Sequence, residues 1–115
     1  MKMLEKKARL KKNKEFDRVW QKGRSSFDGL LGVKAVANGL GCNRFGVLVG
    51  LKVGKKAVER NSVKRRIRES IRSMIPSLKI GFDVVIISLP AAKGKELAKI
   101  KESLADNMRR IKLLI

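Results

Sequence analysis

Residues 57–75 constrain the fold more than any other segment, because their apolar side chains recur at helical spacing. When residues are placed about 100° apart around a helix axis, four apolar side chains fall within an arc of about 80°: Val63, Ile67, Ile71 and Met74. Pro76 follows, and proline cannot continue a helix because its ring clashes with the preceding turn. We therefore expect a long amphipathic helix whose apolar stripe packs onto a core.

Strand patterns occur in three other stretches of the chain. Residues 30–37 alternate between two faces, and residues 44–51 form a second apolar segment after a loop rich in Gly and Asn. Residues 82–88 are a nearly continuous apolar run, which is typical of a central strand buried on both faces. We expect the first two strands to pair with each other as a hairpin.

Two further helices complete the predicted order of elements. Residues 13–22 indicate a short helix, with Asn13 as its N-cap and Gly23 as its C-terminal stop. Residues 95–113 indicate a last helix, because their apolar side chains recur at intervals of three and four. The order α-β-β-α-β-α predicts the α+β class, as a single domain over residues 1–115 with one central sheet and helices packed on it.

The charge balance points to a polyanionic partner. The 115 residues include 29 Lys and Arg against 10 Asp and Glu, which gives a net charge of +19. A free chain with this charge repels itself, and the size of the imbalance favours nucleic acid over an acidic peptide. Residues 1–12 form a basic arm of the predicted RNA-binding domain. Either this arm is a solvated, disordered tail, or it orders on phosphates.

Composition excludes several kinds of catalytic and metal site. The chain has no His and a single cysteine, Cys42, so zinc sites built from Cys and His are impossible, as are His-dependent nucleophiles. The carboxylates are scattered along the sequence, whereas a two-metal nuclease gathers several at one site. A lone loop thiol fits a reducing compartment, and no apolar run is long enough to span a membrane. We therefore expect a cytoplasmic protein without a metal site or catalytic residues of its own.

The flank beside the apolar stripe of residues 57–75 is the strongest local signal of function. It gathers basic and polar side chains: Arg60, Asn61, Lys64, Arg65, Arg68 and Arg72. Like charges four residues apart on a helix repel each other by roughly 0.2–0.5 kcal/mol per pair. An external anion such as an RNA phosphate relieves this repulsion, and Arg offers it a planar pair of donors. The alternative is a charged helix face that is simply solvated.

Two weaker signals precede this helix in the sequence. Phe16 and Trp20 share one face of the first predicted helix among cations, which suits stacking on unpaired bases, although an aromatic pair there also suits a core. The Gly-rich loop carrying Lys52, Lys55 and Lys56 either holds an RNA phosphate or is a flexible surface loop. It lacks the Gly-Lys-Ser/Thr ending of nucleotide-binding loops, so NTP binding is not expected.

The basic helix resembles the Arg-Asn-x-x-Lys-Arg-x-x-Arg-Glu signature of the bacterial ribonuclease P protein subunit, because residues 60–69 read Arg-Asn-Ser-Val-Lys-Arg-Arg-Ile-Arg-Glu. Residues 9–16 (Arg-Leu-Lys-Lys-Asn-Lys-Glu-Phe) and 44–49 (Arg-Phe-Gly-Val-Leu-Val) are similar to that family's opening segment and to one of its strands. The resemblance covers nearly the whole chain and agrees with its length, charge and order of elements.

The resemblance implies a role beside a catalytic RNA. In the family, ribonuclease P RNA with Mg²⁺, bound mainly by that RNA, hydrolyses a phosphodiester to remove the 5′ leader from precursor tRNA. By this resemblance, the helix that contacts the catalytic RNA presents Arg60, Asn61, Lys64, Arg65 and Arg68, and Arg72 extends it. The cleft for the single-stranded leader presents Phe16, Trp20, Lys34 and Lys52, with Lys55 and Lys56 beside it. The resemblance also implies a left-handed βαβ crossover, and it implies no protein partner.

The chain departs from the family pattern at three places. Leu51 precedes Lys52 where relatives often carry a lysine pair, Ser88-Leu89 stands where they tend to carry Ala-Arg, and Trp20 replaces a common Phe. Trp20 keeps the stacking surface and adds an indole N–H. A ribosomal or other structural RNA-binding protein is the alternative interpretation of a small basic α+β domain. A stand-alone metal-dependent nuclease is a third, and the scattered carboxylates argue against it.

Overall fold

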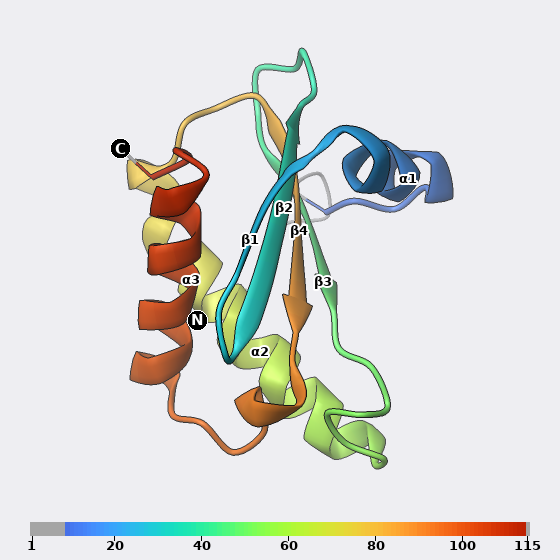
Figure 1. Cartoon of the computed structure of the whole chain (residues 1–115), viewed down its shortest axis with the longest axis vertical. Coiled ribbons are helices and arrows are strands. Elements are labelled where there is room, and N and C mark those ends of the chain that lie inside the picture. The colour runs from blue at the N-terminus through green and yellow to red at the C-terminus, as the bar shows by residue number, and fades with distance from the viewer. Residues whose placement is uncertain (1–8, 115) are drawn as a thin grey trace.

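A four-stranded mixed sheet forms the centre of this computed structural model, which describes residues 9–114 (Figure 1). Its strands are β1 (Arg24–Phe27), β2 (Leu31–Ala37), β3 (Arg44–Leu48) and β4 (Phe82–Ser88). They lie in the order β1-β2-β4-β3. The pairs β1–β2 and β2–β4 are antiparallel, whereas β3 and β4 are parallel.

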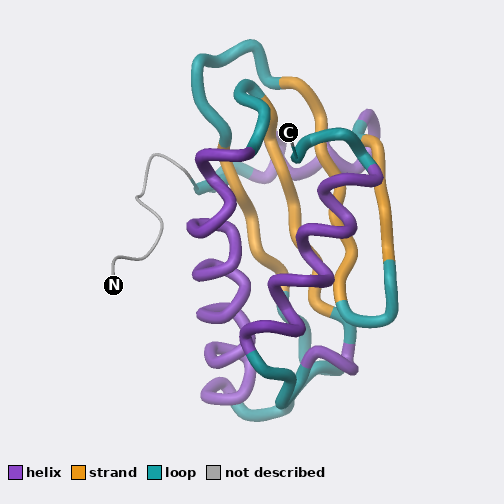
Figure 2. Tube along the Cα trace, turned by 90° about the vertical axis from the view of Figure 1, so that its left-hand side faces the viewer, coloured by secondary structure: helices purple, strands orange, loops and turns teal. Residues whose placement is uncertain are grey.

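Helices cover the sheet on both faces. They are α1 (Asn13–Lys22), α2 (Ala57–Met74) and α3 (Leu97–Arg110), with the short 3₁₀ helices η2 (Ile75–Ser77) and η3 (Pro90–Ala92). Figures 1 and 2 show α2 and α3 together on one face of the sheet. Helix α1 packs on the opposite face through a cluster of Leu10, Val19 and Val85.

The larger core lies between the sheet and the α2–α3 layer. The predicted apolar stripe of α2 is buried there, with Val63 at 1% exposure and Ile67 and Ile71 at 0%. Val33 and Ile86 of the sheet belong to the same cluster. The prediction of an amphipathic helix with this core-facing stripe is confirmed, and the stripe fixes how α2 is rotated about its axis.

Strand β1 was not predicted, so the observed order is α-β-β-β-α-β-α rather than α-β-β-α-β-α. Its sequence, Arg-Ser-Ser-Phe, is short and polar and gives no apolar alternation. It lies at the edge of the sheet, where backbone hydrogen bonds to β2 hold it. The α+β class with one central sheet is confirmed.

The predicted hairpin between residues 30–37 and 44–51 is wrong, because β4 lies between β2 and β3. Val84 of β4 joins the core on one face of the sheet, and Val85 joins the cluster on the other. A strand that is apolar on both faces takes the centre of a sheet, which confirms the prediction for residues 82–88. The observed hairpin is instead β1–β2.

Asp28 fixes the turn of the β1–β2 hairpin. Its Oδ1 accepts hydrogen bonds from the N–H groups of Leu30 and Leu31, both at 2.9 Å, and its Oδ2 accepts one from the Ser103 hydroxyl at 2.6 Å. Burial acts to raise the pKa of the Asp28 carboxyl, but these hydrogen bonds outweigh it, so the pKa lies below its ordinary value. The turn is thereby tied to α3.

Helix α1 has the predicted bounds, but its N-cap residue is Lys12 rather than Asn13. Glu15 in the first turn accepts hydrogen bonds from the N–H groups of Lys11 and Lys12, both at 3.1 Å. A carboxylate at this position satisfies N–H groups that a helix leaves unpaired, so a capping Asn is not needed.

Other predicted bounds differ from the observed ones by a few residues. Strand β2 begins at Leu31 rather than 30, β3 ends at Leu48 rather than 51, α2 ends at Met74 rather than 75, and α3 spans Leu97–Arg110 rather than 95–113. The unit β3–α2–β4 joins two adjacent parallel strands, and the left hand of this crossover stays a prediction. Of the predicted basic arm, residues 1–8 lie outside the described residues.

Candidate RNA interface

The polar flank of α2 lies beside the buried stripe, and the six predicted residues reach solvent to different degrees. Asn61 and Arg65 are exposed, whereas four others are half-buried: Arg60, Lys64, Arg68 and Arg72. Because the stripe is locked into the core, the flank keeps one direction relative to the sheet. This places a row of donors on one rigid element.

Arg60 is engaged in the fold itself. Its Nη1 donates to the carbonyl oxygens of Gly54 and Lys55, both at 2.8 Å. These bonds close the loop before α2 onto the first turn of the helix. The sequence indicated contact with an anion or a solvated helix face for Arg60, and did not predict this structural role.

Arg68 lies beside a second cation, Arg9, which was not among the predicted site residues. The two line a small cavity of about 120 Å³ together with Phe16 and Gly46. Burial, and then the charge of Arg9, lower the pKa of Arg68. Within residues 9–114, the Nε of Arg9 is buried without a hydrogen-bond partner. Two guanidinium groups with an unpaired buried donor are suited to an anion such as a phosphate.

Phe16 is half-buried in the structure. It packs against the cluster of Leu10, Val19 and Val85. Its ring also covers Gly46 of β3, where a Cβ would lie 2.5 Å from Cε1 and 2.7 Å from Cζ of Phe16. The ring therefore contributes to the core, and Phe16 also lines the Arg9–Arg68 cavity.

Gly46→Ala is expected to displace the Phe16 ring, because a Cβ at this position overlaps the ring. Overpacking of this kind lowers the free energy of unfolding by about 1–3 kcal/mol, which urea denaturation measures. Gly50→Ala is the matched control, since nothing lies within 4 Å of a Cβ there. Equal stability of the two variants would contradict the observed packing of Phe16.

Trp20 and Lys34 form the accessible aromatic and cationic pair on the α1 side of the sheet. Trp20 is 39% exposed. The Nζ of Lys34 lies 4.9 Å from the centroid of the Trp20 ring and donates to the Trp20 carbonyl at 3.2 Å. The structure thus brings together two of the residues predicted for the leader cleft, one from α1 and one from β2.

An ion-pair network holds α1 on the sheet. Arg44 of β3 donates through Nε and Nη2 to the two carboxylate oxygens of Asp83, each at 2.8 Å, and through Nη1 to Glu15 of α1, also at 2.8 Å. Asp83 also accepts from the Asn38 amide at 2.9 Å, and its side chain is 1% exposed. The hydrogen bonds to Asp83 raise the pKa of Arg44. This network positions α1 and the aromatic side chains it carries.

The predicted loop lysines lie apart from the Trp20–Lys34 pair. Lys52, Lys55 and Lys56 line a depression of about 440 Å³ with Glu59 and Lys93. Lys93, which was not predicted, pairs with Glu59 at 2.8 Å. Figure 1 shows this loop beyond the C-terminal end of β3, whereas α1 lies near the start of that strand. In the described part of the chain, the three lysines therefore do not lie beside the aromatic side chains of α1.

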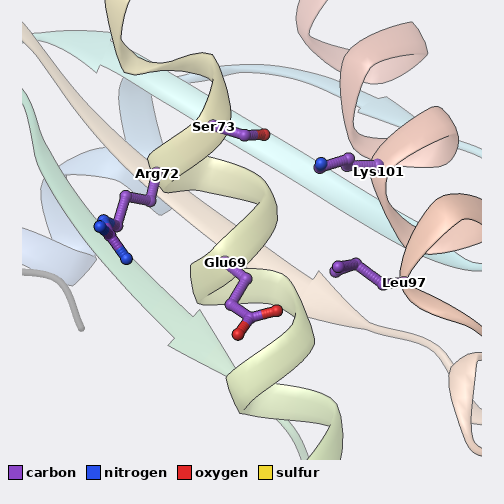
Figure 3. Close-up of a pocket in the computed structure, with 5 residues that line it drawn as sticks. All are labelled: Glu69, Arg72, Ser73, Leu97 and Lys101. Carbon is purple, nitrogen blue, oxygen red and sulfur yellow. The ribbon is translucent and has the colours of Figure 1, made fainter. Parts of the chain in front are cut away.

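A further depression, of about 240 Å³, lies between α2 and α3. It is lined by Glu69, Arg72, Ser73, Leu97 and Lys101. Figure 3 shows Arg72 extending away from Lys101, with Glu69 on the stretch of α2 below them. The two cations do not converge on one point, so this depression lacks the arrangement of an anion site.

Metal and membrane features are absent from the described residues. Within 9–114, no group of three or more His, Cys, Asp or Glu side chains could hold a metal ion. The helices of the same segment also fall short of the length and apolar character needed to cross a membrane. Cys42 is an exposed free thiol.

A cationic helix flank and an exposed aromatic ring beside a lysine both suit a flexible polyanion with unpaired bases. The fold and this surface together define a small basic domain suited to binding RNA, in agreement with the nucleic-acid partner that the net charge of +19 indicates.

Comparison with known proteins shows the family to which this domain belongs. The family model described as Ribonuclease P matches residues 4–112. The chain is 40% identical over 106 residues to the ribonuclease P protein component of Alkaliphilus metalliredigens, covering 92% of this chain and 95% of the relative. It is 40% identical over 112 residues to that of Clostridium acetobutylicum, covering 96% and 93%. The solved RNase P protein of Staphylococcus aureus matches with a TM-score of 0.85 at 30% identity, covering 94% of this chain and 98% of that one. The chain belongs to the ribonuclease P protein family.

Membership of this family confirms the resemblance that residues 60–69 carry. It supports the interpretation of the chain as a protein component of ribonuclease P, acting in tRNA 5′ processing, over the alternatives of a ribosomal protein or a stand-alone nuclease.

Proposed function

We propose that this chain assists ribonuclease P RNA in the endonucleolytic removal of the 5′ leader from precursor tRNA, by binding both the catalytic RNA and the leader. The observation that carries the proposal is the flank of α2, whose cations are fixed beside a buried stripe. Phosphates of a folded RNA relieve the repulsion among these cations, and release of counterions from the RNA adds to the binding free energy.

The catalytic RNA lies along the flank, against Asn61, Lys64, Arg65 and Arg68. Arg9 and Arg68 share a cavity at the edge of this flank, next to Phe16. A phosphate in that cavity would accept hydrogen bonds from both guanidinium groups, including the buried Nε of Arg9. The cavity thereby joins the surface for the catalytic RNA to the sheet face that carries α1.

The leader lies on that sheet face, where Trp20 offers a stacking surface and Lys34 a cation for the phosphate. The two groups lie 4.9 Å apart and come from different elements, so an unpaired nucleotide meets both at once. Phe16 contributes less stacking surface, because its ring packs into the core.

We assign the Mg²⁺ of the reaction to the RNA subunit. Mg²⁺ keeps several waters and binds phosphate oxygens with one or two carboxylates rather than a cage of protein side chains, and the RNA supplies those phosphates. The protein's part is to neutralise phosphates where two RNA strands approach and to hold the substrate, and the RNA carries out bond cleavage.

Trp20→Leu is expected to weaken binding of precursor tRNA that carries a leader by about 1–3 kcal/mol, because the stacking face is lost while apolar bulk is kept. Binding of leaderless tRNA should not change. The measurement is the Kd of the protein–RNA holoenzyme for both substrates, with Gln21→Ala, an exposed neighbour on α1, as the control. Equal losses for the two substrates would remove Trp20 from the leader site.

A further inference from the structure

The sheet face that carries α1 is open at the end away from that helix. The strand register places four residues in one row across this end: Phe27 of β1, Gly32 of β2, Ile87 of β4 and Leu48 of β3. Phe27 is 50% exposed and Leu48 is 37% exposed. Large apolar side chains that stay accessible together on a sheet indicate a contact surface.

Phe27 lies directly over Gly32. A Cβ on Gly32 would sit 2.1 Å from Cε2 and 2.3 Å from Cδ2 of Phe27, so the ring fills the space of the missing side chain. The aromatic ring is thereby supported by the backbone of β2, while half of the residue remains open to solvent.

Both neighbours of Phe27 are tied to α3. The Ser26 hydroxyl donates to Asn107 Oδ1 at 2.7 Å, and Asp28 Oδ2 accepts from the Ser103 hydroxyl at 2.6 Å. These bonds hold the edge strand to the helix layer on one face, and alternation along the strand directs Phe27 to the other. Little conformational entropy is then left for Phe27 to lose when a ligand binds.

The row continues the proposed leader site toward the loop lysines. Gly32 lies two residues before Lys34 on β2, a separation of about 7 Å along a strand. In the other direction, the chain runs from Leu48 into the lysine loop, residues 52–56. Phe27 lies on the edge strand β1 and Leu48 on the opposite edge strand β3. An RNA strand that steps from the Trp20–Lys34 pair to Phe27 and then crosses the whole row to this loop meets Lys34 near its start and the loop lysines at its end.

Resting on the proposed function, we propose that Phe27 is a second stacking position for the single-stranded leader, which receives an unpaired base next to the one on Trp20. The chemistry required is an aromatic face for a nucleobase, with cations at either end for the phosphates, and these positions supply it. A Phe that merely covers a strand glycine would stabilise the sheet without contacting RNA, and the two roles make different predictions.

The test uses the holoenzyme and precursor tRNAs that carry one abasic nucleotide at successive leader positions. With the unchanged protein, we expect two positions at which loss of the base weakens binding, each by about tenfold. Phe27→Leu keeps an apolar cover over Gly32 but removes the aromatic face. It should abolish the abasic effect at one position, and Trp20→Leu should abolish it at the other. Ile80→Ala, an exposed apolar residue outside this row, is the control.

Thermal unfolding of each variant separates stacking from stability. An unchanged abasic profile in Phe27→Leu, with or without a lower Tm, overturns the proposal and leaves Phe27 as a cover for Gly32. If Trp20→Leu still alters the profile in that case, leader binding itself stands. If no abasic position matters even with the unchanged protein, stacking at both rings is refuted.

Discussion

Arg44→Ala is expected to lower the free energy of unfolding by about 3–5 kcal/mol. The reason is that Asp83 would remain buried without the guanidinium that now binds both of its carboxylate oxygens at 2.8 Å. The pair between Arg44 and Glu15 would be lost at the same time, so α1 would no longer be tied to β3. Urea denaturation near neutral pH measures the loss.

Two comparisons isolate this buried pair. Arg109→Ala breaks an exposed pair with Asp106 at 2.9 Å and should cost less than about 1 kcal/mol. Arg44→Met combined with Asp83→Leu removes both charges and should recover much of the stability, because neither charge is left buried. If Arg44→Ala cost no more than Arg109→Ala, the network would not be what holds α1 in place.

Arg65→Ala and Arg68→Ala are each expected to weaken binding to ribonuclease P RNA by about 1–3 kcal/mol, as for hydrogen bonds to charged groups. The Kd of each variant, measured at two salt concentrations, also reports on phosphate contacts. The slope of log K against log salt should fall by about 0.7–0.9 for each phosphate contact that is lost.

Lys99→Ala is the control for these variants, since Lys99 is an exposed cation on α3. It should change neither the affinity nor the salt slope by a comparable amount. Affinities of Arg65→Ala and Arg68→Ala that stay unchanged at both salt concentrations would exclude the flank of α2 as the surface for the catalytic RNA.

The fold was predictable where one element carries a strong periodic pattern. Helix α2 shows its apolar stripe at helical spacing, and β4 shows an unbroken apolar run, so both were found with nearly correct bounds. Strand β1 was not, because its short polar sequence gives no apolar alternation. The order of the strands was not, because β4 pairs with β2 and β3 across long stretches of sequence. The apolar sequence of residues 44–48 is compatible with pairing to β2 or to β4. Strand β3 lies beside β4 because β4 occupies the centre of the sheet.

The candidate site likewise contains features that a local sequence pattern predicts and features that depend on distant segments. The common flank of the α2 cations was predictable because they lie on one helix, whose geometry is known in advance. The ion pair of Arg44 with Asp83 joins residues 39 positions apart. Arg9 and Arg68 come from two different segments and line one cavity. No local pattern indicates either arrangement. The burial of Phe16 depends on the absence of a side chain at Gly46, which also lies far from it in the sequence.

Cleavage of a precursor tRNA at low Mg²⁺ tests the proposed function most directly. The reaction is run with the purified protein, with a bacterial ribonuclease P RNA, and with both together. We expect strong cleavage at the mature 5′ end only when both are present. Cleavage by the protein alone would contradict the assignment of the chemistry to the RNA, and a lack of stimulation by the protein would contradict its role as a subunit of this enzyme.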